Sequence, residues 1–164
     1  MRHAVIARRE IEPAERIEDF VLLAIRDATG REVSRNFYWL STQEDELDWA
    51  NTKWYYTPTK AHADLRALAS LPATSLMVTS KFAPQGDEQR ARVTVVNTGK
   101  ALAFQVRLKA IDASTGEEIL PVFWEDNYFA LFPGETRNVE VSVRAPAAAR
   151  LTVTAEAWNA ATAR

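Results

Sequence analysis

Apolar and polar residues alternate along several short stretches in the second half of the chain. A period of two places apolar side chains on one face of an extended strand, so each stretch predicts a half-buried antiparallel strand. Turn-forming residues separate the stretches, and this spacing predicts a two-sheet antiparallel β-sandwich of the immunoglobulin or fibronectin type III class. The apolar positions are Leu76, Val78 and Phe82; Val93 and Val95; Phe104, Val106 and Leu108; Val139, Val141 and Val143; and Leu151, Val153 and Ala155.

A β-hairpin is predicted near the N-terminus, over residues 20–25 and 33–40. The stretch from Leu22 to Val33 has the same pattern as the stretch from Leu108 to Ile119, because each apolar run meets Asp, Ala, Thr and Gly before charged and β-branched residues resume. Glycine allows a positive φ and Asp bonds its own backbone, so both stretches are typical of hairpin turns. Internal duplication and convergence on a common turn explain the shared pattern equally well.

One short connecting helix is predicted between the hairpin and the sandwich. Residues 60–69 are strong helix formers, Thr59 can act as the N-cap, and Pro72 ends the pattern. A hairpin is only marginally stable by itself in water, so this one is expected either to dock on the sandwich or to form the terminal strands of a preceding immunoglobulin-like domain. The predicted organisation is a hairpin at residues 1–45, an aromatic-rich connector at 46–71 and the sandwich at 72–164.

Composition is that of a globular chain close to one average domain in size. The 164 residues are 47% hydrophobic and 26% charged, which excludes a disordered or low-complexity protein. The formal net charge is −2 and the basic residues are scattered, so we expect no nucleic acid as partner. No apolar run approaches the roughly 18 residues of a membrane span, so we expect no membrane partner either.

The sequence has few of the residues and motifs that reactive or metal-binding sites require. There is no cysteine, which excludes disulfides, iron–sulfur clusters and thiolate zinc sites. With His3 and His62 as the only histidines, we expect no metal site and no cofactor. Neither a G-x-S-x-G motif nor a phosphate-binding glycine loop occurs.

Aromatic residues are dense between Phe37 and Tyr56. Aromatic rings can stack on sugar faces, and they can equally bury a junction between two modules, because one end of Trp or Tyr is apolar and the other finds a polar partner. We favour the junction. For the alternative, the candidate carbohydrate-binding residues are Trp49, Trp54, Tyr55 and Trp124.

Carboxylates gather at residues 44–48 and at Glu125-Asp126. Hydrolysis of a glycoside needs two carboxyl groups across a cleft, about 5–5.5 Å or 6.5–9.5 Å apart. Sequence spacing does not supply such a distance, and we interpret these residues as surface acids near turns.

Two motifs carry a family resemblance. Residues 34–41 read SRNFYWLS, and Asp48-Trp49 and residues 54–60 (WYYTPTK) follow ahead of Ala63-Asp64-Leu65; a second run, residues 127–135, reads NYFALFPGE. On these motifs, the chain resembles the C-terminal region of glycoside hydrolase family 2 enzymes of the exo-β-D-glucosaminidase and β-mannosidase type. The resemblance extends from about residue 18 to residue 158. In that family the first motif closes one immunoglobulin-like domain and leads through a Trp/Tyr-rich connector into the last one.

The resemblance implies a non-catalytic piece of a longer enzyme. The family's catalytic carboxylates lie in a (β/α)₈ barrel of about 250 residues, which this sequence does not encode. The Asn-Glu dipeptide that carries the family's acid/base glutamate is also absent, so no catalytic residue is expected. The implied partners are the other domains of the parent glycosidase. Residues 1–17 match nothing in the family, and a periplasmic or secreted parent is compatible with the sequence.

Two other functions stay open beside interdomain packing. The chain can be an independent carbohydrate-binding module that uses the four candidate rings to hold an oligosaccharide. It can also be a generic adhesion or assembly module, in which exposed sheet edges pair with a second chain to give a dimer.

Overall fold

Two compact units make up the chain, and they divide between Ser70 and Leu71. The structure is a computed structural model that describes residues 18–41, 43–146 and 148–163. Within these residues, no helix has both the length and the apolar character needed to cross a membrane.

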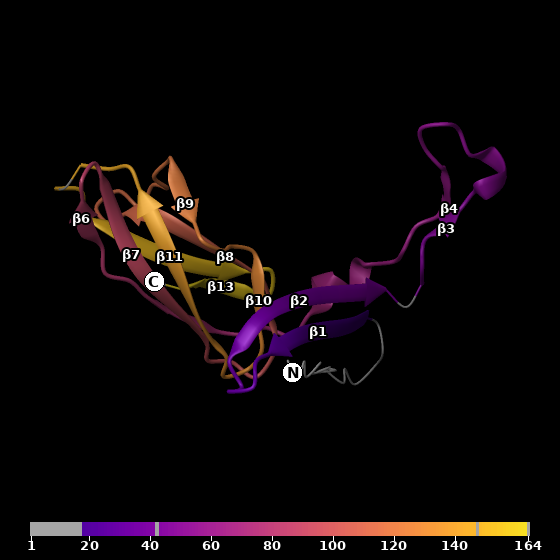
Figure 1. Ribbon diagram of the computed structural model, residues 1–164, viewed down its shortest axis with the longest axis horizontal. Helices are drawn as coiled ribbons and strands as arrows, with labels where there is room; N and C mark the ends of the chain where they lie inside the picture. Colours follow the sequence, from indigo (N-terminus) through magenta and orange to yellow (C-terminus); the bar gives the residue numbers. More distant parts are fainter. Residues whose placement is uncertain (1–17, 42, 147, 164) are drawn as a thin grey trace. The chain divides into compact units, whose positions relative to one another are not determined.

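The second unit is an antiparallel β-sandwich of two sheets (Figure 1), as the alternating pattern predicts. One sheet has the strand order β10–β8–β12–β13, and the other has the order β5–β7–β11–β9, with β6 also paired to β7. Every ladder between these strands is antiparallel, which confirms the all-β fold class. The strands are β5 (Leu76–Thr79), β6 (Ala83–Gln85), β7 (Glu88–Asn97), β8 (Ala103–Asp112), β9 (Val122–Trp124), β10 (Phe129–Leu131), β11 (Thr136–Val143), β12 (Leu151–Ala157) and β13 (Ala160–Ala163).

The core of the sandwich is built from alternate residues of its long strands. Val93 and Val95 of β7 have no exposed surface, and Val139 and Val143 of β11 are buried just as completely. Burying each such side chain contributes about 1.5–3 kcal/mol through the hydrophobic effect. The period-two prediction therefore holds along these strands.

The alternation fails at one place in β8. Gln105 has a φ of +54°, and the register of β8 against β10 shifts at this point. As a result, Ala103 joins Val106 and Leu108 in one buried cluster, whereas Phe104 is buried outside that cluster. The prediction that Phe104 shares a face with Val106 is wrong, because the extra residue of a β-bulge moves the preceding side chains to the opposite face.

The first unit contains the predicted hairpin, formed by β1 (Glu18–Arg26) and β2 (Glu32–Ser41). On one of its faces the rings of Phe20 and Phe37 stack, with centroids 5.7 Å apart.

The turns of the two similar stretches are built alike. Asp27 and Asp112 each accept a hydrogen bond from the backbone N–H two residues later, at 3.0 and 2.7 Å. Gly30 and Gly116 follow with φ values of +84° and +78°. The first turn leads into a full strand, whereas the second is followed by a single bridge to Ile111.

The connecting helix is shorter than expected, and the prediction of a helix over 60–69 is wrong. Thr59–Ala61 form strand β4, which pairs with β3 (Glu46–Leu47), and only Arg66–Ser70 form a 3₁₀ helix, η2. An isolated helix of about ten residues is marginal in water, so pairing with another segment overrides the local propensity.

Candidate functional site

A short ribbon in the first unit carries the aromatic residues. Strands β3 and β4 enclose residues 48–58, which we call the aromatic loop and which include the 3₁₀ helix η1 (Trp49–Asn51). The loop is closed by its own backbone, because the Asp48 N–H donates to the Pro58 carbonyl at 2.8 Å and the Lys53 N–H donates to the Tyr56 carbonyl at 2.8 Å. These bonds give the loop a defined shape.

The rings of the aromatic loop lie on its surface. Trp54 is 94% exposed, Trp49 is 72% exposed and Tyr55 is 67% exposed. Trp54 meets Tyr55 edge to face at 5.0 Å, and the rings of Tyr55 and Tyr56 are also 5.0 Å apart. The loop therefore joins three rings into one exposed apolar surface, which could meet a sugar face or a second protein surface.

The acidic residues of this ribbon have local structural roles. Asp45 accepts the Ala63 N–H at 2.8 Å, which ties the two sides of the ribbon together, and Asp48 accepts the Asn51 side-chain amide at 2.7 Å. His62 lies 3.8 Å from Asp45 in an exposed pair. These contacts agree with the interpretation of the acids as residues near turns.

Asp64 lies two residues before the 3₁₀ helix η2. Arg66 donates to both of its carboxylate oxygens, with Nε 2.9 Å from Oδ1 and Nη2 2.5 Å from Oδ2. The side-chain hydrogen bond from Arg66 lowers the pKa of Asp64 to about 2. Because the backbone N–H of Arg66 also donates to Asp64, the pair fixes the start of η2.

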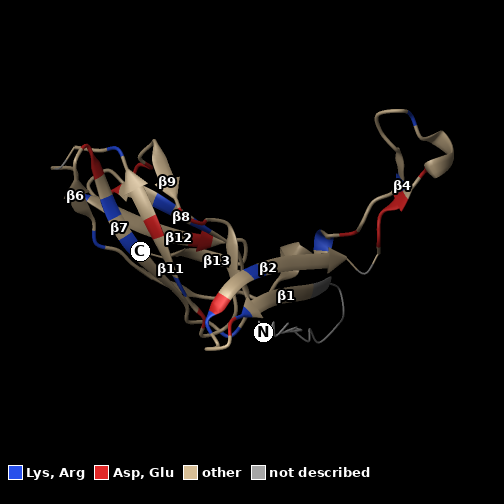
Figure 2. Ribbon diagram, viewed as in Figure 1, with Lys and Arg blue, Asp and Glu red and all other residues tan. Residues whose placement is uncertain are grey.

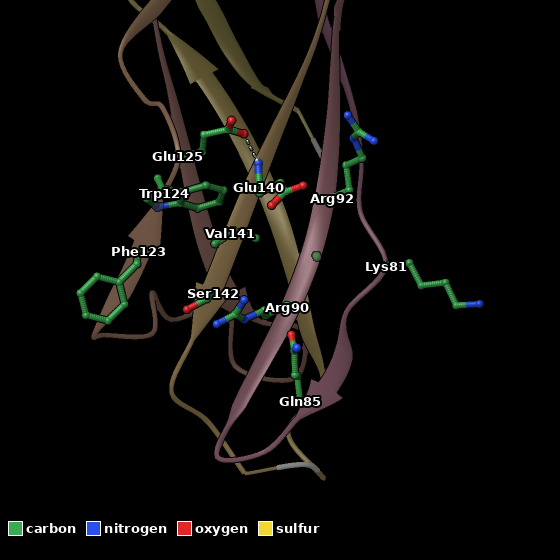
Figure 3. Close-up of a pocket in the computed structure, with 11 residues that line it drawn as sticks. Lys81, Gln85, Arg90, Arg92, Phe123, Trp124, Glu125, Glu140, Val141 and Ser142 are labelled. Atoms are coloured by element: carbon green, nitrogen blue, oxygen red, sulfur yellow. Dashed lines mark hydrogen bonds between the residues drawn. The ribbon is translucent and has the colours of Figure 1, made fainter.

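A shallow groove of about 520 Å³ lies on the outer face of the five-stranded sheet (Figure 3). Arg92 lies opposite Glu140 in the register of β7 and β11, and Arg90 lies opposite Ser142. Lys81 adds a third positive charge and Glu125 a second negative one to the lining. This sheet groove is therefore polar and mixed in charge.

Glu88 binds two residues that line the sheet groove. It accepts hydrogen bonds from Ser142 Oγ at 3.0 Å and from Arg90 Nη2 at 3.1 Å. These bonds lower the pKa of Glu88, and the bond from Ser142 has the largest effect. The carboxylate therefore stays ionised and hydrogen-bonded to both residues.

The candidate ring Trp124 belongs to this second site rather than to the aromatic loop. It lies opposite Val141 in the register and packs, half-buried, against the sandwich core. Its neighbour Phe123 lies opposite Ser142 and is exposed beside the sheet groove. The structure thus brings Trp49, Trp54 and Tyr55 together on one loop and leaves Trp124 in the other unit.

Two exposed rings of the four-stranded sheet were not among the sequence candidates. Tyr128 and Trp158 are 58% and 64% exposed and line a common pocket. Tyr128 lies in the motif at residues 127–135, and each of the two rings has an asparagine beside it, Asn127 and Asn159.

The described surfaces are suited to binding. Among residues 18–41, 43–146 and 148–163, no group of three or more His, Asp or Glu side chains is arranged to hold a metal ion. The surfaces described above offer exposed rings, paired charges and open polar grooves.

Comparison with known proteins finds relatives among the exo-β-D-glucosaminidases. The family described as the exo-β-D-glucosaminidase Ig-fold domain matches residues 54–160. An exo-β-D-glucosaminidase of Arthroderma benhamiae is 39% identical over 85% of this chain, and one of Streptomyces avermitilis is 44% identical over 74%. The chain covers 15% and 14% of these two proteins. The crystal structure of the Amycolatopsis orientalis exo-chitosanase CsxA superposes with a TM-score of 0.81 at 34% identity, covering 91% of this chain and 18% of that one.

Proposed function

Because this chain belongs to the exo-β-D-glucosaminidase Ig-fold domain family, we propose that it is a non-catalytic β-sandwich region of a family 2 exo-glycosidase. Its role is to pack against the other domains of that enzyme, whose reaction is the hydrolysis of terminal β-D-glucosaminyl or β-D-mannosyl residues. The chain spans about 15% of the length of the relatives it matches, which supports the role of one domain region among several.

The observation that carries this proposal is an uncovered apolar face on the hairpin. Residues directly opposite in an antiparallel pair point to the same side, so one face collects alternate residues of β1 and their partners on β2. Leu23, Ile25, Tyr38 and Leu40 on this face are all exposed. Exposure of an apolar face of a two-stranded sheet to water is unfavourable. We therefore expect another protein surface to cover this face.

We infer that the occupant is the rest of a preceding immunoglobulin-like domain of the same enzyme. Among the described residues, β1 and β2 pair only with each other, and a β-sandwich covers such an apolar sheet face with a second sheet. The hairpin at residues 1–45 then serves as the terminal strands of that domain, and the connector at 46–71 leads from it to the sandwich at 72–164.

Complementation tests the packing role. We expect the 164-residue chain alone to show no hydrolysis of p-nitrophenyl β-D-glucosaminide. An exo-β-D-glucosaminidase shortened by its matching C-terminal region should bind the chain on a gel-filtration column and regain stability or activity. Leu23→Glu should abolish the association, whereas Met77→Glu, which places the same charge at an exposed apolar position of β5, should not. Hydrolysis by the chain alone, or association unaffected by Leu23→Glu, contradicts the proposal.

A second candidate function is sugar contact by the aromatic loop. It is favoured by the exposure of Trp54 and by the joined rings of Tyr55 and Tyr56. Calorimetric titration of the chain with glucosamine and mannose oligomers tests it. If the loop is the site of binding, Trp54→Ala removes it, while Phe123→Ala, which changes an exposed ring on the sandwich, leaves it intact.

Assembly through sheet edges is a third proposal. β9 is one of the outer strands of the five-stranded sheet, and β13 is one of the outer strands of the other. Unpaired backbone groups at such edges can add a strand from a second chain. Sedimentation analysis over a range of concentrations tests this, and a monomer at every concentration removes it.

A further inference from the structure

A second groove lies on the outer face of the four-stranded sheet, away from the aromatic loop in sequence. Gln105 and Arg107 of β8 and Glu156 of β12 line it, together with Tyr128, Trp158 and the start of β13. Its volume is about 370 Å³. We call it the Tyr128–Trp158 groove.

The asparagines beside the two rings bind the backbone of β8 with their side chains. Asn127, beside Tyr128, accepts the Leu108 N–H at 2.8 Å and donates to the Leu108 carbonyl at 3.1 Å. Asn159, beside Trp158, accepts the Phe104 N–H at 3.1 Å.

The turn that holds Trp158 is fixed at further points. The Trp158 N–H donates to the Phe104 carbonyl at 2.8 Å, and the Asn159 amide donates to the Leu102 and Pro72 carbonyls at 2.7 Å. The backbone beneath both rings is therefore set before any ligand arrives. Such preorganisation reduces the entropy that binding must lose.

The backbone at the groove is strained. Tyr128 and Gln105 have φ values of +59° and +54°, and they are the two non-glycine residues with positive φ in the described part of the chain. A bulky residue in this region is disfavoured, and such strain clusters at functional sites. The Tyr128 ring is mostly exposed, so burial does not compensate for the strain. Both residues line the same groove, Gln105 at the β-bulge of β8 and Tyr128 directly after Asn127.

The floor of the groove is polar and balanced in charge. Glu156 accepts from Lys109 at 2.8 Å and lies 3.4 Å from Arg107, which also pairs with Glu118 at 2.8 Å. Figure 2 shows the basic residues of β8 beside the acidic residue of β12. The hydrogen bond from Lys109 lowers the pKa of Glu156, so its carboxylate stays ionised. Fixed donors and acceptors of this kind match the hydroxyl groups of a sugar ring.

We propose that the Tyr128–Trp158 groove binds a short oligosaccharide of pyranose rings. Aromatic faces meet the C–H groups of a sugar, while the amide of Gln105, the Arg107 guanidinium and the Glu156 carboxylate meet its hydroxyls. Exposed rings over a charge-balanced polar floor fit this ligand better than an apolar peptide or a phosphate. The site stands on the sandwich and does not depend on the packing role proposed above.

Isothermal titration calorimetry of the 164-residue chain tests the site. The probes are β-1,4-linked trimers of glucosamine, N-acetylglucosamine and glucose, which share the pyranose ring and differ at C2, where only the glucosamine amine is charged. We expect saturable binding of at least one trimer, weakened about tenfold or more by Tyr128→Asn and by Trp158→Ala. Asparagine tolerates a positive φ, so Tyr128→Asn removes the ring while keeping the backbone.

Control variants separate this site from the others. Trp54→Ala and Phe123→Ala should leave the affinity unchanged, and circular dichroism should show the same folded spectrum for every variant. No saturable binding of any trimer at millimolar concentration overturns the proposal, as does binding that only Trp54→Ala abolishes. The packing role is tested separately by complementation, so either proposal can fail without the other.

Discussion

The Asn127 side chain replaces a neighbouring strand for Leu108, because its amide bonds both the N–H and the C=O of that residue, at 2.8 and 3.1 Å. Its Oδ1 also accepts the Tyr128 N–H at 3.0 Å. β10 is only three residues long, and it pairs with β8 at Val106 and Ala103. Asn127 thus extends the hydrogen bonding of β8 beyond the end of its partner strand.

Asn127→Ala should therefore destabilise the sandwich. Two backbone groups of Leu108 lose their partners, and each partly buried group left unsatisfied costs about 1–3 kcal/mol, so we expect a loss of about 2–4 kcal/mol after water replaces part of the bonding. Urea unfolding monitored by circular dichroism measures this. Asn138→Ala, which removes an exposed asparagine of β11 that accepts a bond from Thr94, is the matched control and should change the midpoint little.

Two glycines of the sandwich should respond differently to a methyl group. Gly134 has a φ of +74° but no atom near its added Cβ, so Gly134→Ala should cost about 1 kcal/mol in backbone strain. At Gly99 the added Cβ would lie 2.2 Å from Thr74 Oγ1 and 2.7 Å from the Ser75 backbone nitrogen. Gly99→Ala should therefore cost more, in the range of about 2–4 kcal/mol. Thermal unfolding compares the two, and an equal loss would contradict the close approach at Gly99.

The Pro133–Gly134 turn shows what sequence reasoning could reach. This pair is typical of a type II turn, and the Glu135 N–H does donate to the Phe132 carbonyl at 2.9 Å, with Gly134 at positive φ. The period-two strands of the core are equally local signals. Each depends on a side chain's own chemistry and on its neighbours in the chain, so the sequence predicts both.

The errors come from interactions between distant segments. Residues 59–61 belong to a stretch of strong helix formers, but they form a strand because they pair with β3. The bulge at Gln105 depends on how β8 meets β10, which no local pattern reveals. The half-burial of Trp124 likewise follows from the pairing of β9 with β11, which no local pattern reveals.

Asp64 should titrate at unusually low pH. Its pKa is lowered to about 2 from the ordinary value of 3.8 by the bonds from Arg66. The folded protein therefore favours the ionised form of Asp64. The stability that the ionised carboxylate contributes is complete above the ordinary carboxyl pKa and is lost as the pH falls toward 2. Solvent screens this exposed pair, so the readout should be the carboxyl itself. NMR titration of the Asp64 carboxyl carbon should show the low pKa, and Arg66→Ala should raise it toward 3.8.

Tyr128→Asn should stabilise the protein while removing an aromatic ring. Tyrosine at a φ of +59° carries backbone strain, and asparagine tolerates this conformation because its short polar side chain can bond locally. The ring is mostly exposed, so little burial is lost, and we expect the free energy of unfolding to rise by about 0.5–1 kcal/mol. Chemical unfolding of the chain measures the change. Tyr55→Asn is the control, because it removes an exposed ring from a residue that does not have a positive φ. This variant should not raise the free energy of unfolding. A loss of stability in Tyr128→Asn would show that the tyrosine ring supports the fold, and the strain at this position would then need no ligand to explain it.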